Sequence, residues 1–220
     1  MDPVAAVSHD LFVVFVFDLN CVFIMNTVFR QHLEKVIELT DEEYDHISSH
    51  FASKKLKKHN FVVQEGLPVN YEYFVISGLL KASYLNEQGK EHILQFAMEN
   101  WWVTDYQAFV MQTPATLNID CIEDVELLML SFTNKRKLCT ESHKMEHFFR
   151  MKTTMGYVSL QQRILSLLNS DAQSRYRQFF SLYPQLFQRI PKALIASYLG
   201  VSRETLSRMS NADRDHGPSD

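Results

Sequence analysis

The chain has 220 residues, of which 46% are hydrophobic and 22% charged, with 6 Gly, 6 Pro and 3 Cys. A chain of this length and composition folds into one large or two small globular domains, which excludes collagen-like, low-complexity and disordered proteins. The three cysteines form no CxxC pair. A disulfide framework and a thiolate metal site are therefore both disfavoured, and reduced thiols in a cytoplasm are expected.

The net charge of −4 conceals a division along the chain. Residues 1–133 hold 8 Lys and Arg against 19 Asp and Glu, a net charge of −11, whereas residues 134–210 hold 13 against 4, a net charge of +9. Residues 211–220 hold 1 against 3. Because a polyanion attracts concentrated positive charge, residues 134–210 are the part of the chain expected to bind nucleic acid. The alternative is a chance run of solvated Lys and Arg side chains.

Residues 11–25 form an apolar run that Asp18 and Asn20 interrupt. The run is shorter than the roughly 20 residues that a membrane-spanning helix needs. No Lys or Arg precedes Arg30, which argues against a secretory signal, and Met25 opens a normal amphipathic sequence. We interpret residues 1–24 as an upstream extension from a misassigned start codon. A genuine extra strand or a membrane-contacting segment is the alternative.

Helical spacing then marks residues 28–51, where one face carries Phe29, Leu33, Val36 and Ile37. Within this span Thr40 and Glu43 form a capping-box pattern, which predicts that a second helix begins at residue 41 and runs to residue 51. A basic cluster follows at Lys54, Lys55, Lys57 and Lys58. Such a cluster is typical of a solvated turn, with a phosphate-binding patch as the alternative.

From residue 61 to residue 131 the hydrophobic period changes to two. Six β-rich runs occur here: FVVQ, YEYFVIS, LLKASYL, HILQFAM, LNIDCI and ELLMLS. Gly66, Gly78 and Gly89 punctuate the turns between them. The pattern predicts a small antiparallel sandwich or barrel. No GxGxxG, P-loop, HExxH or GxSxG motif occurs in the sequence.

After residue 134 the helical period returns. One apolar line has heptad spacing, with Gln162 as a polar position, and consists of Phe148, Met151, Met155, Val158 and Leu165. A second line widens this face with Phe149, Leu160, Ile164, Leu167 and Leu168. So broad an apolar face predicts a helix that pairs with a second copy of the chain, the alternative being that it packs only on its own β domain. A further helix is predicted over residues 171–183, ended by Pro184.

Residues 191–209, PKALIASYLGVSRETLSRM, have the pattern of a helix-turn-helix. Gly200 ends the first helix where a positive φ is needed, and Ser202 caps the second. Leu206 and Met209 are predicted to face inward. The outward face then carries Arg203, Glu204, Ser207 and Arg208, within reach of a major groove. An ordinary αα-hairpin is the alternative.

The run LGVSRETLSRM resembles the recognition segment of the Crp/Fnr family of bacterial transcription regulators, and the order of elements over residues 25–209 is similar to that family's. The resemblance implies an α+β fold: an antiparallel β-roll of the double-stranded β-helix or jelly-roll type with flanking helices, a long dimerisation helix and a C-terminal helix-turn-helix. It divides the chain into an effector domain (residues 25–140), a dimerisation helix (141–170), a DNA-binding domain (171–210) and a disordered tail (211–220).

By that likeness, Arg203, Glu204 and Arg208 read bases. Arg can bond guanine O6 and N7 together, and Glu can accept from cytosine N4. Phosphate-contacting or capping roles fall to Ser202, Thr205 and Ser207. The implied partners are double-stranded DNA with an inverted repeat, a second copy of the chain, and RNA polymerase as a candidate.

The effector pocket departs from the family pattern. Cyclic-nucleotide-binding members have a Gly-Glu-Leu run that holds the ribose and, ten residues after the Glu, an Arg beside Ser or Thr that holds the cyclic phosphate. The corresponding positions here are Thr104, Asp105 and Tyr106, then Ala115 followed by Thr116. Asp105 can bond a hydroxyl, but no cation replaces the Arg, and a buried phosphate would keep most of its desolvation cost. We therefore expect no cAMP and no cofactor, and leave an unidentified small effector open.

The expected function is a dimeric, sequence-specific DNA-binding regulator in the cytoplasm. A ligand-binding or protein-interaction module of the same fold with a decayed DNA-binding end is the alternative, because the recognition helix runs into acidic residues after Ser210. An enzyme is not expected, since no paired acid and base, metal set or nucleophile triad occurs at interpretable spacing. Neither a metal nor a membrane partner is expected.

Overall fold

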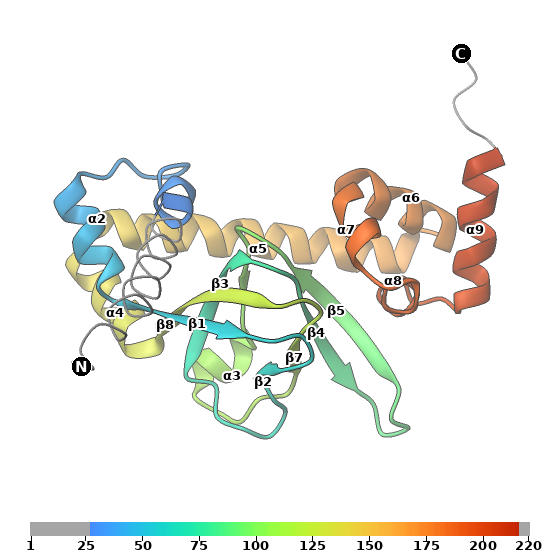
Figure 1. Ribbon diagram of the computed structural model, residues 1–220, viewed down its shortest axis with the longest axis horizontal. Coiled ribbons are helices and arrows are strands. Elements are labelled where there is room, and N and C mark those ends of the chain that lie inside the picture. Colours follow the sequence, from blue (N-terminus) through green and yellow to red (C-terminus); the bar gives the residue numbers. More distant parts are fainter. Residues whose placement is uncertain (1–26, 216–220) are drawn as a thin grey trace, which may run out of the picture.

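The computed structural model describes residues 27–211 in full and the backbone of residues 212–215. The expected N-terminal extension, residues 1–24, and the last five residues of the expected tail lie outside the described residues. The described part is a β-roll with a long helix along one side, small helices at one end and a helical domain at the other (Figure 1). The predicted α+β class and β-roll are confirmed.

The roll consists of two four-stranded antiparallel sheets. One sheet has the order β1 (Phe51–Leu56), β8 (Val125–Ser131), β3 (Tyr71–Ser77) and β6 (Trp102–Val103). The other has the order β2 (Phe61–Val63), β7 (Asn118–Cys121), β4 (Leu80–Leu85) and β5 (Glu91–Ala97). All six β-rich runs contain a strand. A core cluster between the sheets includes Val75, Leu80, Ile119 and Leu127.

The turn from β3 to β4 consists of one glycine and its neighbours. Gly78 has φ +93°, and a Cβ there would lie 2.2 Å from the carbonyl oxygen of Asp124. Any other residue would be strained and would also collide with backbone. This position therefore fixes the close approach of the two sheets.

The N-terminal helices differ in part from the sequence expectation. Residues 27–33 are helical, and α2 (Asp41–Ser48) begins with the predicted capping box of Thr40 and Glu43. The prediction that this helix reaches residue 51 is wrong, because Phe51 begins β1. Val36 is exposed rather than on the buried face. Of the basic cluster, Lys54 and Lys55 lie on β1 instead of in a turn.

Two helices follow the roll. α4 (Phe132–Glu141) is capped by Ser131, and α5 (His143–Asn169) then runs along the side of the roll (Figure 1). Phe148 and Phe149 are buried against Trp102 in the core cluster that joins α5 to the roll. The assignment of Phe148 to a pairing seam is therefore wrong: it belongs to the core of its own chain. The exposed apolar face begins further along α5.

The C-terminal domain consists of four helices, α6 (Ala172–Leu182), α7 (Pro184–Arg189), α8 (Lys192–Leu199) and α9 (Arg203–Asp215). Pro184 ends α6 as predicted and also begins α7, because a proline is tolerated in a first helical turn. Phe96 of β5 packs against Phe179 and Tyr198, so this domain shares a core with the roll. Within the described residues, no helix combines the length and apolarity that crossing a membrane requires.

Candidate functional site

The helix-turn-helix has the geometry that its sequence predicts. Gly200 adopts φ +72° at the end of α8, which redirects the chain. The Thr205 amide donates to Ser202 Oγ at 3.2 Å, so Ser202 caps α9. Leu206 and Met209 are buried. The inner face of α9 is thus held against the domain, and the outer face of the helix is exposed to solvent.

The side chains assigned to base reading lie on that outer face. Arg203, Glu204, Ser207 and Arg208 are all exposed. The Ser202 hydroxyl, together with the backbone and the two nearby arginines, lowers the pKa of Glu204. Its carboxylate is therefore ionised at neutral pH and can only accept hydrogen bonds. Thr205 is half-buried, and its hydroxyl lies 3.2 Å from Ser202 Oγ, as suits a capping role.

The second half of α5 carries an exposed apolar face. Met155 is 59% exposed and Leu168 is 75% exposed, whereas Phe148 near the start of the helix is 2% exposed. Monomeric proteins rarely leave a large contiguous apolar surface in water. The exposed apolar side chains of this helix are Met155, Tyr157, Val158, Leu160, Ile164, Leu165, Leu167 and Leu168.

The predicted effector pocket is organised around one buried carboxylate. Asp105, 1% exposed, caps α3 (Tyr106–Met111) through Oδ1, which accepts from the Ala108 amide at 3.0 Å. Its Oδ2 accepts from the Thr116 amide at 2.7 Å, the Thr116 hydroxyl at 2.9 Å and the Leu117 amide at 3.2 Å. Both oxygens of Asp105 are therefore engaged by the protein itself.

The other predicted pocket residues are brought near this carboxylate but have separate roles. Thr104 is buried and donates its hydroxyl to the Tyr71 carbonyl at 2.9 Å. Ala115 is buried, and its amide donates to the Leu67 carbonyl at 2.8 Å. Tyr106, at the start of α3, is exposed.

Comparisons with known proteins identify the fold. A family model described as the cyclic nucleotide-binding domain matches residues 53–142. The anaerobic regulatory protein of Bacillus subtilis (strain 168) is 26% identical over 100 residues, a match that covers 46% of this chain and 41% of that relative. The match thus spans less than half the length of the curated relative.

Solved structures extend the likeness to most of the chain. FixK2 from Bradyrhizobium japonicum superposes with a TM-score of 0.67 at 17% identity, covering 77% of this chain and 89% of that chain. A Crp/Fnr family regulator from Eubacterium rectale gives a TM-score of 0.63 at 17% identity, covering 81% and 85%. The chain has the Crp/Fnr fold. The fold that the resemblance implied is therefore confirmed.

Within this Crp/Fnr fold, sequence analysis missed a buried charge network between the roll and α5. Glu72 on β3 is 0% exposed and pairs with Lys135 Nζ at 2.9 Å and Lys152 Nζ at 3.0 Å. Lys152 also lies 3.9 Å from the ring centroid of Trp102. Burial lowers the pKa of Lys152 to about 8, against the opposing effect of Glu72. No local motif marks these residues, because the partners are 63 and 80 positions apart.

A second missed cluster holds the C-terminal helical domain on the roll. Arg189, at the end of α7, donates to both Glu99 oxygens at 2.8 and 2.9 Å and to both Glu123 oxygens at 3.0 and 2.6 Å. Glu99 in turn accepts from the Gly78 amide at 2.8 Å. Bidentate Arg–carboxylate pairs fix orientation as well as position. The angle of the helix-turn-helix is thus linked to the β3–β4 turn.

Proposed function

We propose that the protein is a dimeric, sequence-specific DNA-binding transcription regulator that acts in the cytoplasm and has no enzymatic activity. One observation carries the proposal: α9 is capped and packed on its inner face, while Arg203, Glu204 and Arg208 are exposed on the outer face of its first two turns. The N-terminal residues of a recognition helix are the ones that reach base edges in a major groove.

The chemistry of these side chains suits base reading. An arginine can donate two hydrogen bonds to guanine O6 and N7, and the ionised Glu204 can accept from cytosine N4. Ser202, Thr205 and Ser207 are suited to phosphate contacts or to capping, which fix register rather than sequence. We assign base reading to the charged residues and positioning to the hydroxyls.

The dimer is proposed on the exposed apolar face of α5. A two-fold axis along this helix would bring Met155 and Val158 of the two copies together and remove their side chains from water. Two α9 helices related by such an axis require an inverted repeat whose half-site centres lie about 10 bp, one helical turn, apart.

The dimer seam has a direct test. We expect Met155→Lys to weaken dimerisation by about 3 kcal/mol or more, because it would bury two like charges across the axis. Met155 is exposed in the single chain, so the variant is expected to fold. Analytical ultracentrifugation at micromolar concentration measures the loss, with the exposed Met111→Lys on α3 as the matched control. A fully dimeric Met155→Lys protein would show that the seam is misassigned.

The DNA proposal is tested by selection of bound sequences from a random pool. The expected result is a palindromic motif with half-sites one helical turn apart. Recovery of no palindrome would refute the sequence-specific regulator and favour a ligand-binding or protein-interaction module with a decayed DNA-binding end. A salt-dependent gel shift on the recovered fragments then separates specific binding from general attraction to a polyanion.

We further propose that the effector domain does not bind cAMP. The donors of Thr116 are already bound to Asp105, and Ala115 places a methyl group where cyclic-nucleotide-binding members have an arginine. An incoming phosphate would meet a carboxylate of its own sign and no compensating cation at this position. The domain would then act on the helix-turn-helix in response to something else, or constitutively.

A further inference from the structure

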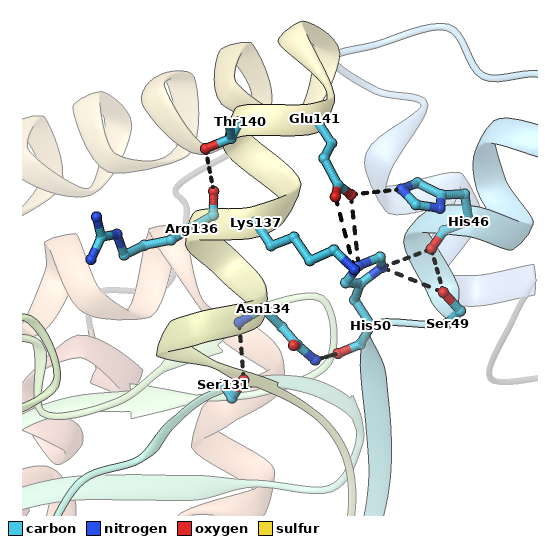
Figure 2. Close-up of polar contacts among 9 residues, drawn as sticks. All are labelled: His46, Ser49, His50, Ser131, Asn134, Arg136, Lys137, Thr140 and Glu141. Atoms are coloured by element: carbon cyan, nitrogen blue, oxygen red, sulfur yellow. Dashed lines mark hydrogen bonds and ion pairs between the residues drawn. The ribbon is translucent and has the colours of Figure 1, made fainter.

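Two histidines and a glutamate converge at the end of the molecule opposite the helix-turn-helix. His46 lies in the last turn of α2, His50 lies in the turn that follows the helix before β1, and Glu141 is the last residue of α4 (Figure 2). Their candidate ligand atoms all lie within 4.8 Å of one another. No short motif in the sequence marks this cluster, because Glu141 is 95 residues from His46.

We propose that His46, His50 and Glu141 form a Zn²⁺ site. Zinc binding there is separate from the DNA binding proposed above and does not depend on it.

The distances fit a tetrahedral zinc ion. Zn–N and Zn–O bonds of about 2.0–2.1 Å place two ligand atoms of a tetrahedron roughly 3.3 Å apart. His46 Nε2 lies 3.2 Å from Glu141 Oε2, which is already this separation. His50 Nε2 lies 4.0 Å from the same oxygen. The remaining separation, between the two imidazole nitrogens, is within 4.8 Å, so side-chain adjustments of up to about 1.5 Å would close the set, with water as the fourth ligand.

The buried histidine is held in the orientation that a ligand needs. His50 Nδ1 lies 2.9 Å from the His46 carbonyl oxygen, a contact in which Nδ1–H donates and the Nε2 lone pair is left for a metal. The carbonyl of His50 accepts from Asn134 Nδ2 of α4 at 2.8 Å. The side chain of His50 is 7% exposed. Both its backbone and its ring are thus positioned before any ion binds.

The two carboxylate oxygens of Glu141 face different groups. Oε2 faces the two imidazoles, whereas Oε1 lies 3.8 Å from Lys137 Nζ (Figure 2). Lys137 is exposed, so it neutralises part of the carboxylate charge without blocking Oε2. Side chains of His46 and Glu141 are 51% and 39% exposed, which gives an ion a route from solvent.

The donor set selects zinc over harder cations. Two imidazole nitrogens and one carboxylate oxygen suit Zn²⁺, whereas Mg²⁺ and Ca²⁺ require mostly oxygen ligands. The ion would join α2 to the last residue of α4, immediately before Ser142, which caps α5. Zinc would therefore fix the junction from which the long helix begins.

The test is calorimetric titration of Zn²⁺ into the untagged, full-length chain after its metals have been removed with a chelator. We expect one Zn²⁺ per chain and a rise in the thermal unfolding midpoint, because an ion that binds only the native state stabilises it. Co²⁺ substituted at the site is expected to show the visible absorption of a tetrahedral complex. Absence of binding at micromolar Zn²⁺ would overturn the proposal.

Variants locate the ion. His46→Ala and Glu141→Gln are expected to lower Zn²⁺ affinity by at least about tenfold, since loss of even an outer contact to a metal ligand costs that much. Both side chains are exposed, so the metal-free variants are expected to unfold at the same temperature as the parent. His92→Ala on β5, also exposed, is the matched control and is expected to bind as the parent does. Unchanged affinity in both site variants would place the zinc elsewhere and refute the assignment.

Discussion

The charged side chains of the pocket around Asp105 and those on the outer face of α9 lie in opposite environments. Asp105 is buried, and four donors of its own chain bind its two oxygens. Arg203, Glu204 and Arg208 are exposed and extend into solvent. A charge that the protein satisfies internally stabilises the fold, whereas a charge left at the surface contributes little to stability and is available to a partner. Changes at the two places should therefore separate stability from binding.

The largest effect is expected at the buried carboxylate. Asp105→Ala would leave the donors of Ala108, Thr116 and Leu117 without their acceptor, which costs about 3–5 kcal/mol of unfolding free energy. Denaturant unfolding measures the loss. Glu87→Ala, which removes an exposed carboxylate from the turn between β4 and β5, is the control and should change stability by less than about 0.5 kcal/mol. If the two substitutions lowered the unfolding free energy equally, the proposed difference between the buried and the exposed carboxylate would be wrong.

Acid should weaken the roll through a second internally bonded group, His32. Its Nε2 accepts from Trp102 Nε1 at 3.1 Å, and burial, with Lys35 and Lys152 nearby, lowers its pKa from 6.5 to about 4. The unfolded chain therefore binds a proton that the folded chain excludes. The stability contribution is complete above pH 6.5 and is lost as the pH falls toward 4, by about 3 kcal/mol in all.

This pH dependence is measured as the unfolding free energy between pH 6.5 and pH 4. The matched variant is His32→Gln, which keeps a polar acceptor but does not titrate. The parent should lose about 3 kcal/mol more than the variant across this range. If the unfolding free energy of the parent and of the variant fell equally with pH, His32 would not be shielded from protonation in the folded chain.

On the outer face of α9, a substitution should change DNA affinity rather than stability. Arg203→Ala is expected to cost about 1–3 kcal/mol of affinity for the selected DNA and to relax preference at one base pair per half-site. Unfolding free energy should change by less than about 0.5 kcal/mol. Lys192→Ala, at the exposed start of α8, is the control for a phosphate contact: affinity would fall alike on all sequences, with a salt slope smaller by about one. The assignment fails if Arg203→Ala behaves as Lys192→Ala does.

Local patterns in the sequence were enough to predict the exposed site but not the buried one. The Ser202 cap and the Gly200 turn are short-range signals, and they place α9 correctly. The donors to Asp105 come from residues up to 12 positions away, so no spacing rule reveals that the carboxylate is bonded to its own chain. α9 also extends to Asp215, past the expected end at Ser210, because polar composition alone does not end a helix.

Elements whose environment is set by distant segments were missed for the same reason. β1 contains Lys54 and Lys55, which hide its strand character, and it forms through antiparallel pairing with β8, more than 60 residues later. Helical periodicity identified the apolar face of α5 but not what covers it. Phe148 was therefore assigned to the dimer seam, whereas it lies in the core of its own chain. A helical period shows which residues share a face, and the fold decides what covers it.

The smallest expected effect is that of cAMP on thermal stability, which should be zero. A nucleotide at 100 times its dissociation constant would add about 2.7 kcal/mol to the unfolding free energy and raise the melting temperature visibly. Here binding would require the phosphate to displace Asp105 from Thr116 and to be buried beside Ala115 without a cation. Because Asp105 is held by four donors, that exchange loses protein hydrogen bonds without gaining a charge partner. Melting curves with millimolar cAMP, compared with the same concentration of 5′-AMP as the baseline for general nucleotide effects, should coincide. A shift specific to cAMP would show that the contacts of Asp105 open to admit a ligand, and the pocket would then belong with α9 among the surfaces available to a partner.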